Sequence, residues 1–193
     1  MISKILSVLY IICNRYLVEK LRNISIYVVL RLRGMHGGKG LVAHKMISVR
    51  DWACNLYLGD NVTLHQGVRL ILSRKTRLEL GDKVWISAYT TIISSNETQV
   101  IIGKDTMIGP NTVIVSADHD IHDKLSLRES GAKSGDIYIG ENCWIGANCV
   151  ITKNVRIGTG AIIGAGSVVT KDIPSMTIAT GIPAKVIKKR YIK

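Results

Sequence analysis

The stretch Ser116–Asp123, SADHDIHD, holds two of the chain's five histidines and three aspartates. A histidine near its ordinary pKa can take a proton from a hydroxyl group, so His119 or His122 could act as a general base. Imidazole and carboxylate groups also bind metal ions, and the His-x-x-His spacing flanked by aspartates could form such a site. A solvated surface turn is the third interpretation, and the surrounding sequence has to be compared with all three.

A six-residue repeat surrounds this stretch. From Ile139 to Pro174 the sequence reads IGENCW, IGANCV, ITKNVR, IGTGAI, IGAGSV and VTKDIP, and similar units occur at 58–69, 80–91 and 102–119. A period of six fits neither an α-helix nor simple alternation along a strand. It predicts a β-helix in which each unit is a short strand and a turn, with three units to a coil. Inward aliphatic side chains would then form the core, and Gly or Asn would supply positive φ at the corners.

Residues 120–136 do not fit the six-residue pattern, so we expect the coil to extrude them as a loop before it resumes at Ile137–Ile139. Loops on a rigid scaffold commonly carry chemistry, and His119 is the last repeat residue before this one. The position favours a catalytic role for His119. A metal site is disfavoured because ligands three residues apart suit a helix better than a loop, and no third cluster of ligands appears elsewhere.

The net charge of +12 is concentrated at the two ends of the chain. Residues 1–50 contain nine basic residues and one acidic residue, residues 183–193 contain five and none, and residues 51–182 contain twelve and thirteen. Basic ends suit an anionic membrane surface or a phosphate-bearing ligand. Aromatic residues are only 5% of the chain, which argues against a surface that stacks nucleic-acid bases.

We expect three regions: a basic, amphipathic helical segment with its lead-in at 1–50, the β-helix at 51–175 and a basic tail at 176–193. The apolar run at 5–13 is too short to span a bilayer, and a secretory cleavage site is lacking. The helix could lie at a membrane interface or pack on a neighbouring subunit. Cys143 and Cys149 are six residues apart and should occupy equivalent packing positions, as expected of a protein in a reducing cytoplasm.

The repeat resembles the hexapeptide-repeat acyltransferases, and within them the branch of maltose, galactoside and polysaccharide O-acetyltransferases. The resemblance covers roughly 58–188 and is carried by IGENCWIGANCVI at 139–151, IGAGSVVTKDIP at 163–174 and GIPAKVIKK at 181–189. It implies a left-handed parallel β-helix, although the general rule for parallel crossovers is right-handed. It also implies a homotrimer with active sites between subunits and acetyl-CoA as donor. Because of the ligand spacing described above, no metal is expected.

The resemblance also assigns roles to single residues. His119 matches the catalytic histidine that precedes a protruding loop, with Asp120 where relatives usually have proline. Positions that relatives use for the donor correspond to Ala147, Ala165, Thr170, Lys171, Lys185 and Lys188. Relatives often have arginine at the last two, and lysine keeps the charge without the bidentate fork. Trp144 is interpreted as a ring in the subunit groove near the pantetheine, or as a plain surface residue, and His122 as an acceptor-side or solvated loop residue.

Together these features predict an acetyl-CoA-dependent O-acetyltransferase acting on a sugar hydroxyl. The acceptor would belong to a surface polysaccharide such as a capsule, an O-antigen or an exopolysaccharide, and could be lipid-linked because of the basic N-terminal segment. The enzyme would be cytoplasmic, at the inner face of the membrane. Two alternatives remain open: a xenobiotic or amino-sugar N-acetyltransferase of the same fold, and a non-enzymatic β-helix scaffold.

Overall fold

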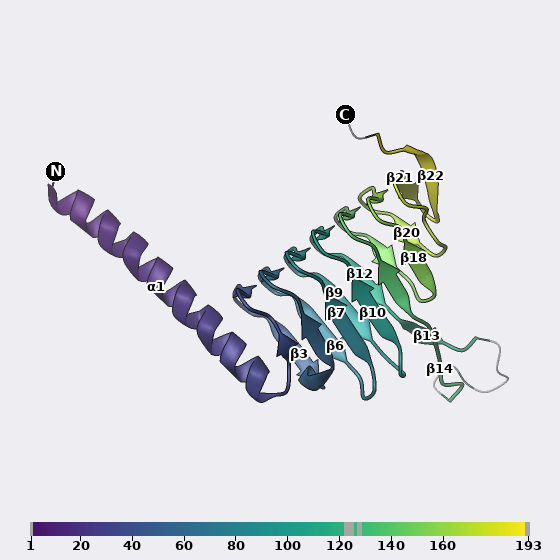
Figure 1. Cartoon of the computed structure of the whole chain (residues 1–193), viewed down its shortest axis with the longest axis horizontal. Helices are drawn as coiled ribbons and strands as arrows, with labels where there is room; N and C mark the ends of the chain where they lie inside the picture. Colours follow the sequence, from purple (N-terminus) through teal and green to yellow (C-terminus); the bar gives the residue numbers. More distant parts are fainter. Residues whose placement is uncertain (1, 122–125, 127–128, 192–193) are drawn as a thin grey trace.

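A three-sided stack of coils forms the body of the computed structural model, and a long helix leans away from its N-terminal end (Figure 1). The structure describes residues 2–121, 126 and 129–191, with side chains from Leu17 onward. The helix α1 spans Ile2–Leu32. No helix in these described ranges is both long enough and apolar enough to cross a membrane.

Each face of the stack is one sheet. Sheet A contains β1 (His36–Gly37), β4 (Leu56–Leu58), β7 (Arg77–Leu80), β10 (Gln99–Ile102), β15 (Ile137–Ile139) and β18 (Val155–Ile157). Sheet B contains β2 (Val42–Ala43), β5 (Thr63–Leu64), β8 (Trp85–Ile86), β11 (Met107–Ile108), β16 (Trp144–Ile145), β19 (Ile162–Ile163), β21 (Thr177–Gly181) and β22 (Ala184–Lys189). Sheet C contains β3 (Ser48–Asp51), β6 (Arg69–Leu72), β9 (Thr91–Ser94), β12 (Val113–Val115), β17 (Val150–Ile151) and β20 (Val168–Val169), and the short 3₁₀ helix η1 (Ala53–Asn55) follows β3.

The strands stack in parallel with matching register, so equivalent repeat positions form columns. On sheet B, Ile86 pairs with Ile108, Ile108 with Ile145 and Ile145 with Ile163, and all four are fully buried. Burying these branched side chains stabilises the stack by removing apolar area from water. The parallel β-helix with inward aliphatic columns, predicted from the period of six, is confirmed.

The corners differ from the expectation in one respect. The glycines that follow the inward aliphatic residue, such as Gly146, do not have positive φ; the left-handed positions fall two residues later, at Asn142 and Asn148. Gly146 is needed for close stacking, because a Cβ there would lie 2.5 Å from the backbone nitrogen of Ala165. Asparagine tolerates the left-handed conformation. At such a corner the glycine therefore allows close stacking, and the asparagine two residues later adopts the positive φ.

The first coil begins at His36, earlier than the boundary at 51 that the sequence suggested. Its strands β1, β2 and β3 pair in register with β4, β5 and β6. The repeat was obscured because Gly37 and Ala43 replace leucine at the inward positions. Leu30 and Met35 precede this coil, and both are buried members of the core cluster.

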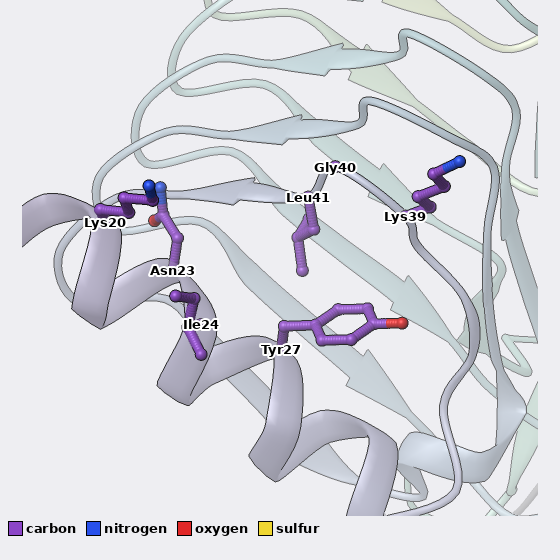
Figure 2. A pocket seen from close by; sticks show the side chains of 7 residues that line it. All are labelled: Lys20, Asn23, Ile24, Tyr27, Lys39, Gly40 and Leu41. Carbon is purple, nitrogen blue, oxygen red and sulfur yellow. The ribbon is translucent and has the colours of Figure 1, made fainter.

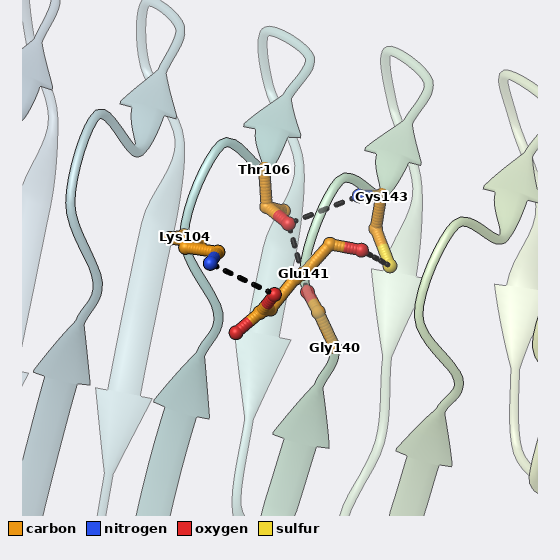
Figure 3. Close-up of polar contacts among 5 residues, drawn as sticks. All are labelled: Lys104, Thr106, Gly140, Glu141 and Cys143. Atoms are coloured by element: carbon orange, nitrogen blue, oxygen red, sulfur yellow. Dashed lines mark hydrogen bonds and ion pairs between the residues drawn. The ribbon is translucent and has the colours of Figure 1, made fainter.

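Polar groups inside the corners are satisfied within the stack. Figure 3 shows the Thr106 hydroxyl, which donates to the carbonyl of Gly140 at 2.8 Å and accepts from the amide of Cys143 at 3.0 Å. The thiols of Cys143 and Cys149 are buried and donate to the carbonyls of Gly158 and Gly164 in the next coil. The two cysteines therefore occupy equivalent packing positions, and burial raises the pKa of both thiols.

Candidate active site

The excursion around His119 is an antiparallel ribbon of β13 (Ala117–His119) and β14 (Ala132–Ser134). It leaves the stack after the buried Ser116, and the coil resumes at β15 (Figure 1). The expectation that His119 ends the repeat is therefore wrong, because the coil ends at Ser116 and His119 stands on the ribbon. There it pairs with Ala132 and is exposed.

Polar contacts fix the ribbon at its base and along its length. The amide of Gly135 donates to the carbonyl of Ser116 at 2.9 Å, which closes the base. Lys153, on the corner after β17, forms an ion pair with Asp118, and Lys133 forms one with Asp120 at 3.0 Å. The two aspartates on either side of His119 thus hold the ribbon strand, which leaves the imidazole facing solvent, where it can meet a substrate.

Trp144, Lys185 and Lys188 share the outer face of sheet B. Trp144 stands in an outward column with Trp85, Met107 and Ile162, and its side chain is half exposed. Lys188 pairs with Ile178, whose partner on β19 is Ile162, and Lys185 pairs with Thr180. The face therefore offers an apolar strip that ends in two exposed ammonium groups, an arrangement that fits a ligand with an apolar arm and phosphates.

Ala147 and Ala165 lie at the corner between sheets B and C in successive coils. The amide of Gly166 donates to the carbonyl of Ala147 at 2.8 Å, which places one alanine directly over the other. Small side chains at both positions leave this edge of sheet B unobstructed. Five of the seven predicted donor residues are thus brought to one face and its adjoining edge.

Thr170 and Lys171 are separated from that group. They follow β20 at the corner between sheets C and A, one coil beyond Thr152 and Lys153. The ribbon with His119 leaves from this same edge, since Lys153 contacts Asp118. Within one chain, the width of sheet C lies between the predicted base and most of the predicted donor residues.

The remaining sequence expectations concern metal ligands and His122. His122 lies outside the described residues. Among the residues that are described, no group of three or more His, Cys, Asp or Glu side chains could hold a metal ion.

The sequence did not single out a groove on the outer face of sheet A. The groove has a volume of about 690 Å³ and passes over Ile101, Tyr138 and Arg156 in three successive coils. The Arg156 guanidinium lies 4.0 Å from the centre of the Tyr138 ring, whose hydroxyl donates to Asp136 at 2.9 Å. The adjoining end of the groove is lined by Asp136, Asn154 and Asp172.

These groove residues can bind hydroxyl-rich ligands. The Arg156 fork donates, and the carboxylates of Asp136 and Asp172 can each accept more hydrogen bonds than the fold uses. Tyr138 and Arg156 are 18 residues apart, which is one full coil. Writing the sequence in rows of 18 would have placed one above the other, but nothing in either residue alone marks a site.

The three-sided coil of hexapeptides, with a histidine on an extruded ribbon, defines the class as the left-handed parallel β-helix of hexapeptide-repeat proteins. A family model described as bacterial transferase hexapeptide (six repeats) matches residues 136–171. A maltose O-acetyltransferase structure from Clostridium difficile 630 is 31% identical, covers 86% of this chain and 75% of its own, and superposes with a TM-score of 0.57. The chain belongs to the hexapeptide-repeat transferase family.

Curated relatives match over shorter segments. Galactoside O-acetyltransferase of Escherichia coli K12 is 34% identical over 76 residues, or 37% of this chain and 34% of the relative. Polysialic acid O-acetyltransferase of Escherichia coli O1:K1 is 56% identical over 73 residues, or 38% of this chain and 22% of the relative. The matches thus span about a third or less of these relatives. The AntD N-acyltransferase of Bacillus cereus, at 24% identity, 84% and 88% coverage and a TM-score of 0.74, shares the fold.

Proposed function

We propose that this protein is an acetyl-CoA-dependent O-acetyltransferase acting on a sugar hydroxyl of a surface polysaccharide or its lipid-linked precursor. The observation that carries the proposal is that the chain presents both an exposed ribbon histidine at one edge of sheet C and, across that sheet, a face that suits a nucleotide thioester. The similarity to galactoside, maltose and polysialic acid O-acetyltransferases supports it, and the solved galactoside acetyltransferase is a complex with coenzyme A.

In the proposed reaction the His119 imidazole takes the proton of the acceptor hydroxyl as its oxygen attacks the thioester carbonyl. The tetrahedral oxyanion then collapses, the carbon–sulfur bond breaks and the acetyl group stays on the sugar oxygen. The departing thiolate receives the proton from the imidazolium. An exposed imidazole suits this cycle because one ring nitrogen can accept the hydroxyl proton and return it to the thiolate.

We infer a homotrimer from the unequal outer faces of the three sheets. Sheet B presents Trp85, Met107 and Trp144 outward, and sheet C presents aliphatic residues such as Ile93 and Val150. Sheet A carries the polar groove. Packing sheet C of one subunit against part of sheet B of the next would shield apolar area on both faces and leave a groove along the seam for the donor. It would also bring the ribbon edge of one chain to the donor face of its neighbour, with the sheet A groove left free for the glycan.

The test is a pair of histidine variants in the full chain. His119→Ala should lower acetyl transfer by about 10²–10⁴-fold, as expected for loss of a general base. Binding of acetyl-CoA, followed by calorimetric titration, should remain. His36→Gln is the matched control, because His36 lies on β1 in the first coil and stacks on Tyr57. Wild-type transfer by His119→Ala would rule out the catalytic assignment.

The acceptor class is tested by the same release of coenzyme A thiol. A panel of neutral oligosaccharides, amino sugars and aminoglycosides separates O-acetylation from the alternative N-acetylation. Faster transfer to an amine than to any hydroxyl would favour the amino-sugar or xenobiotic alternative. A wild-type protein that binds no acetyl-CoA would favour a scaffold.

A further inference from the structure

The helix α1 exposes an apolar stripe away from the stack. The stripe follows helical spacing and consists of Leu17, Leu21, Ile24, Val28 and Leu32, which are between 46% and 82% exposed. Val18 and Val29 beside it are also about half exposed. Aliphatic side chains gathered in this way on a surface mark a site that another surface covers.

From Leu17 onward, where side chains are described, α1 contacts the stack through its C-terminal part. Asn23 accepts a hydrogen bond from the amide of Ala43 at 3.1 Å, Arg22 donates to the carbonyl of the same residue at 3.3 Å, and Leu30 is buried. The N-terminal part projects beyond the first coil (Figure 1). The stripe therefore faces away from the core that the rest of the chain shares.

A pocket with two lysines lies where the stripe meets the first coil. Its volume is about 320 Å³, and Figure 2 shows Lys20 and Lys39 on either side of Ile24, Tyr27 and Leu41. Both lysine side chains are exposed. The pocket thus combines apolar walls with two cationic groups, as a lipid headgroup and its first methylenes require.

The positive charge of α1 favours an anionic lipid surface over a second copy of the helix as the partner of the stripe. The helix sequence contains five basic residues and one acidic residue. Packing it on the same helix of a second copy would place like charges side by side, whereas anionic lipids attract them. No helix in the described part of the chain is long and apolar enough to cross a membrane, and a basic helix with an exposed apolar stripe fits a position in the interface.

We propose that α1 lies in the surface of an anionic lipid membrane, with the stripe in the acyl boundary and with Lys20 and Lys39 beside the lipid phosphates. The contact would keep the enzyme beside lipid-linked glycans. It does not depend on acetyl transfer, so the two proposals can fail separately.

The experiment measures co-sedimentation of the full chain with vesicles of phosphatidylcholine alone or mixed with phosphatidylglycerol. Removing one lysine near such a surface costs about a factor of five, so Lys20→Gln with Lys39→Gln should weaken binding to the mixed vesicles about thirtyfold. Arg74→Gln with Lys83→Gln is the matched control, because both residues are exposed on coil turns and the same charge is removed.

A second variant, Leu17→Gln with Leu21→Gln, should lose binding to both kinds of vesicle, and these exposed positions should tolerate the change. The proposal would be overturned if the wild-type protein bound vesicles with and without phosphatidylglycerol equally well. It would also be overturned if the Lys20→Gln, Lys39→Gln variant bound the mixed vesicles as well as the Arg74→Gln, Lys83→Gln control. A Leu17→Gln, Leu21→Gln variant that keeps vesicle binding but changes oligomeric mass would overturn it as well, since a second copy would then cover the stripe. Titration with acetyl-CoA should be unaffected in every variant.

Discussion

Replacing Lys153 with glutamine should loosen the ribbon that carries His119. Lys153 and Asp118 form the ion pair that joins the stack to β13. The Lys153 side chain is only 23% exposed, whereas that of Asp118 is 47% exposed, so the pair is less screened than a pair in open solvent. We therefore take the upper end of the range for surface pairs, about 1 kcal/mol.

A loss of about 1 kcal/mol corresponds to roughly a fivefold change in the opening equilibrium of the ribbon. Hydrogen exchange of the amides in Ala117–His119 and Ala132–Ser134 should become up to about five times faster. Acetyl transfer should fall by no more than the same factor, because the imidazole stays in place but is held less firmly. The melting temperature should fall by less than about 4 °C.

Lys75→Gln is the matched control. It removes an ion pair with Glu97 at 2.8 Å whose two side chains are about two-thirds exposed, on turns of the coil. Ribbon exchange and transfer should be unchanged in this variant. Equal exchange in the Lys153 variant and the wild type, or equal acceleration in both variants, would refute the idea that the ion pair positions His119.

Three further outcomes follow from burial. Ile114→Ala, at a fully buried position, should cost about 2–5 kcal/mol in urea unfolding. A thiol reagent should modify exposed Cys54 quickly but Cys143 and Cys149 only after unfolding, because burial raises their pKa. Burial and nearby His44 lower the pKa of His65, so the unfolded chain binds protons first and stability falls as pH drops through about 6.5. His65→Gln should flatten that fall in thermal melts.

The sequence was most informative where one residue type recurs at one position. Ile108 and Ile145 open their repeat units and stack directly, so the core could be predicted from period alone. The first coil was missed because Gly37 and Ala43 break the aliphatic pattern, although their spacing of six is kept. The ribbon could not be predicted as paired strands either, because β13 and β14 are short and lack alternation of apolar and polar residues.

The donor-binding residues could be predicted only from the family resemblance. The stacking of strands explains why several of them share one face. Trp144, Lys185 and Lys188 come from β16 and β22, which share an outer face only because sheet B continues into the antiparallel hairpin of β21 and β22. The sequence suggested a tail there, since a basic run carries no signal for strand pairing. Sheet pairing therefore turns a charge run into part of a surface.

The division of the site follows from the shape of the coil. The outward side chains of one strand all lie on the outer face of one sheet. The corners at the two ends of that strand are separated by the full width of the sheet. Thr170 and Lys171 share the ribbon's edge, while Ala147 and Ala165 share the other edge of sheet C. A rigid stack cannot fold these edges together, so a reaction that uses both needs a second subunit against the first. The apolar outer faces of sheets B and C supply the driving force for that contact in the proposed trimer.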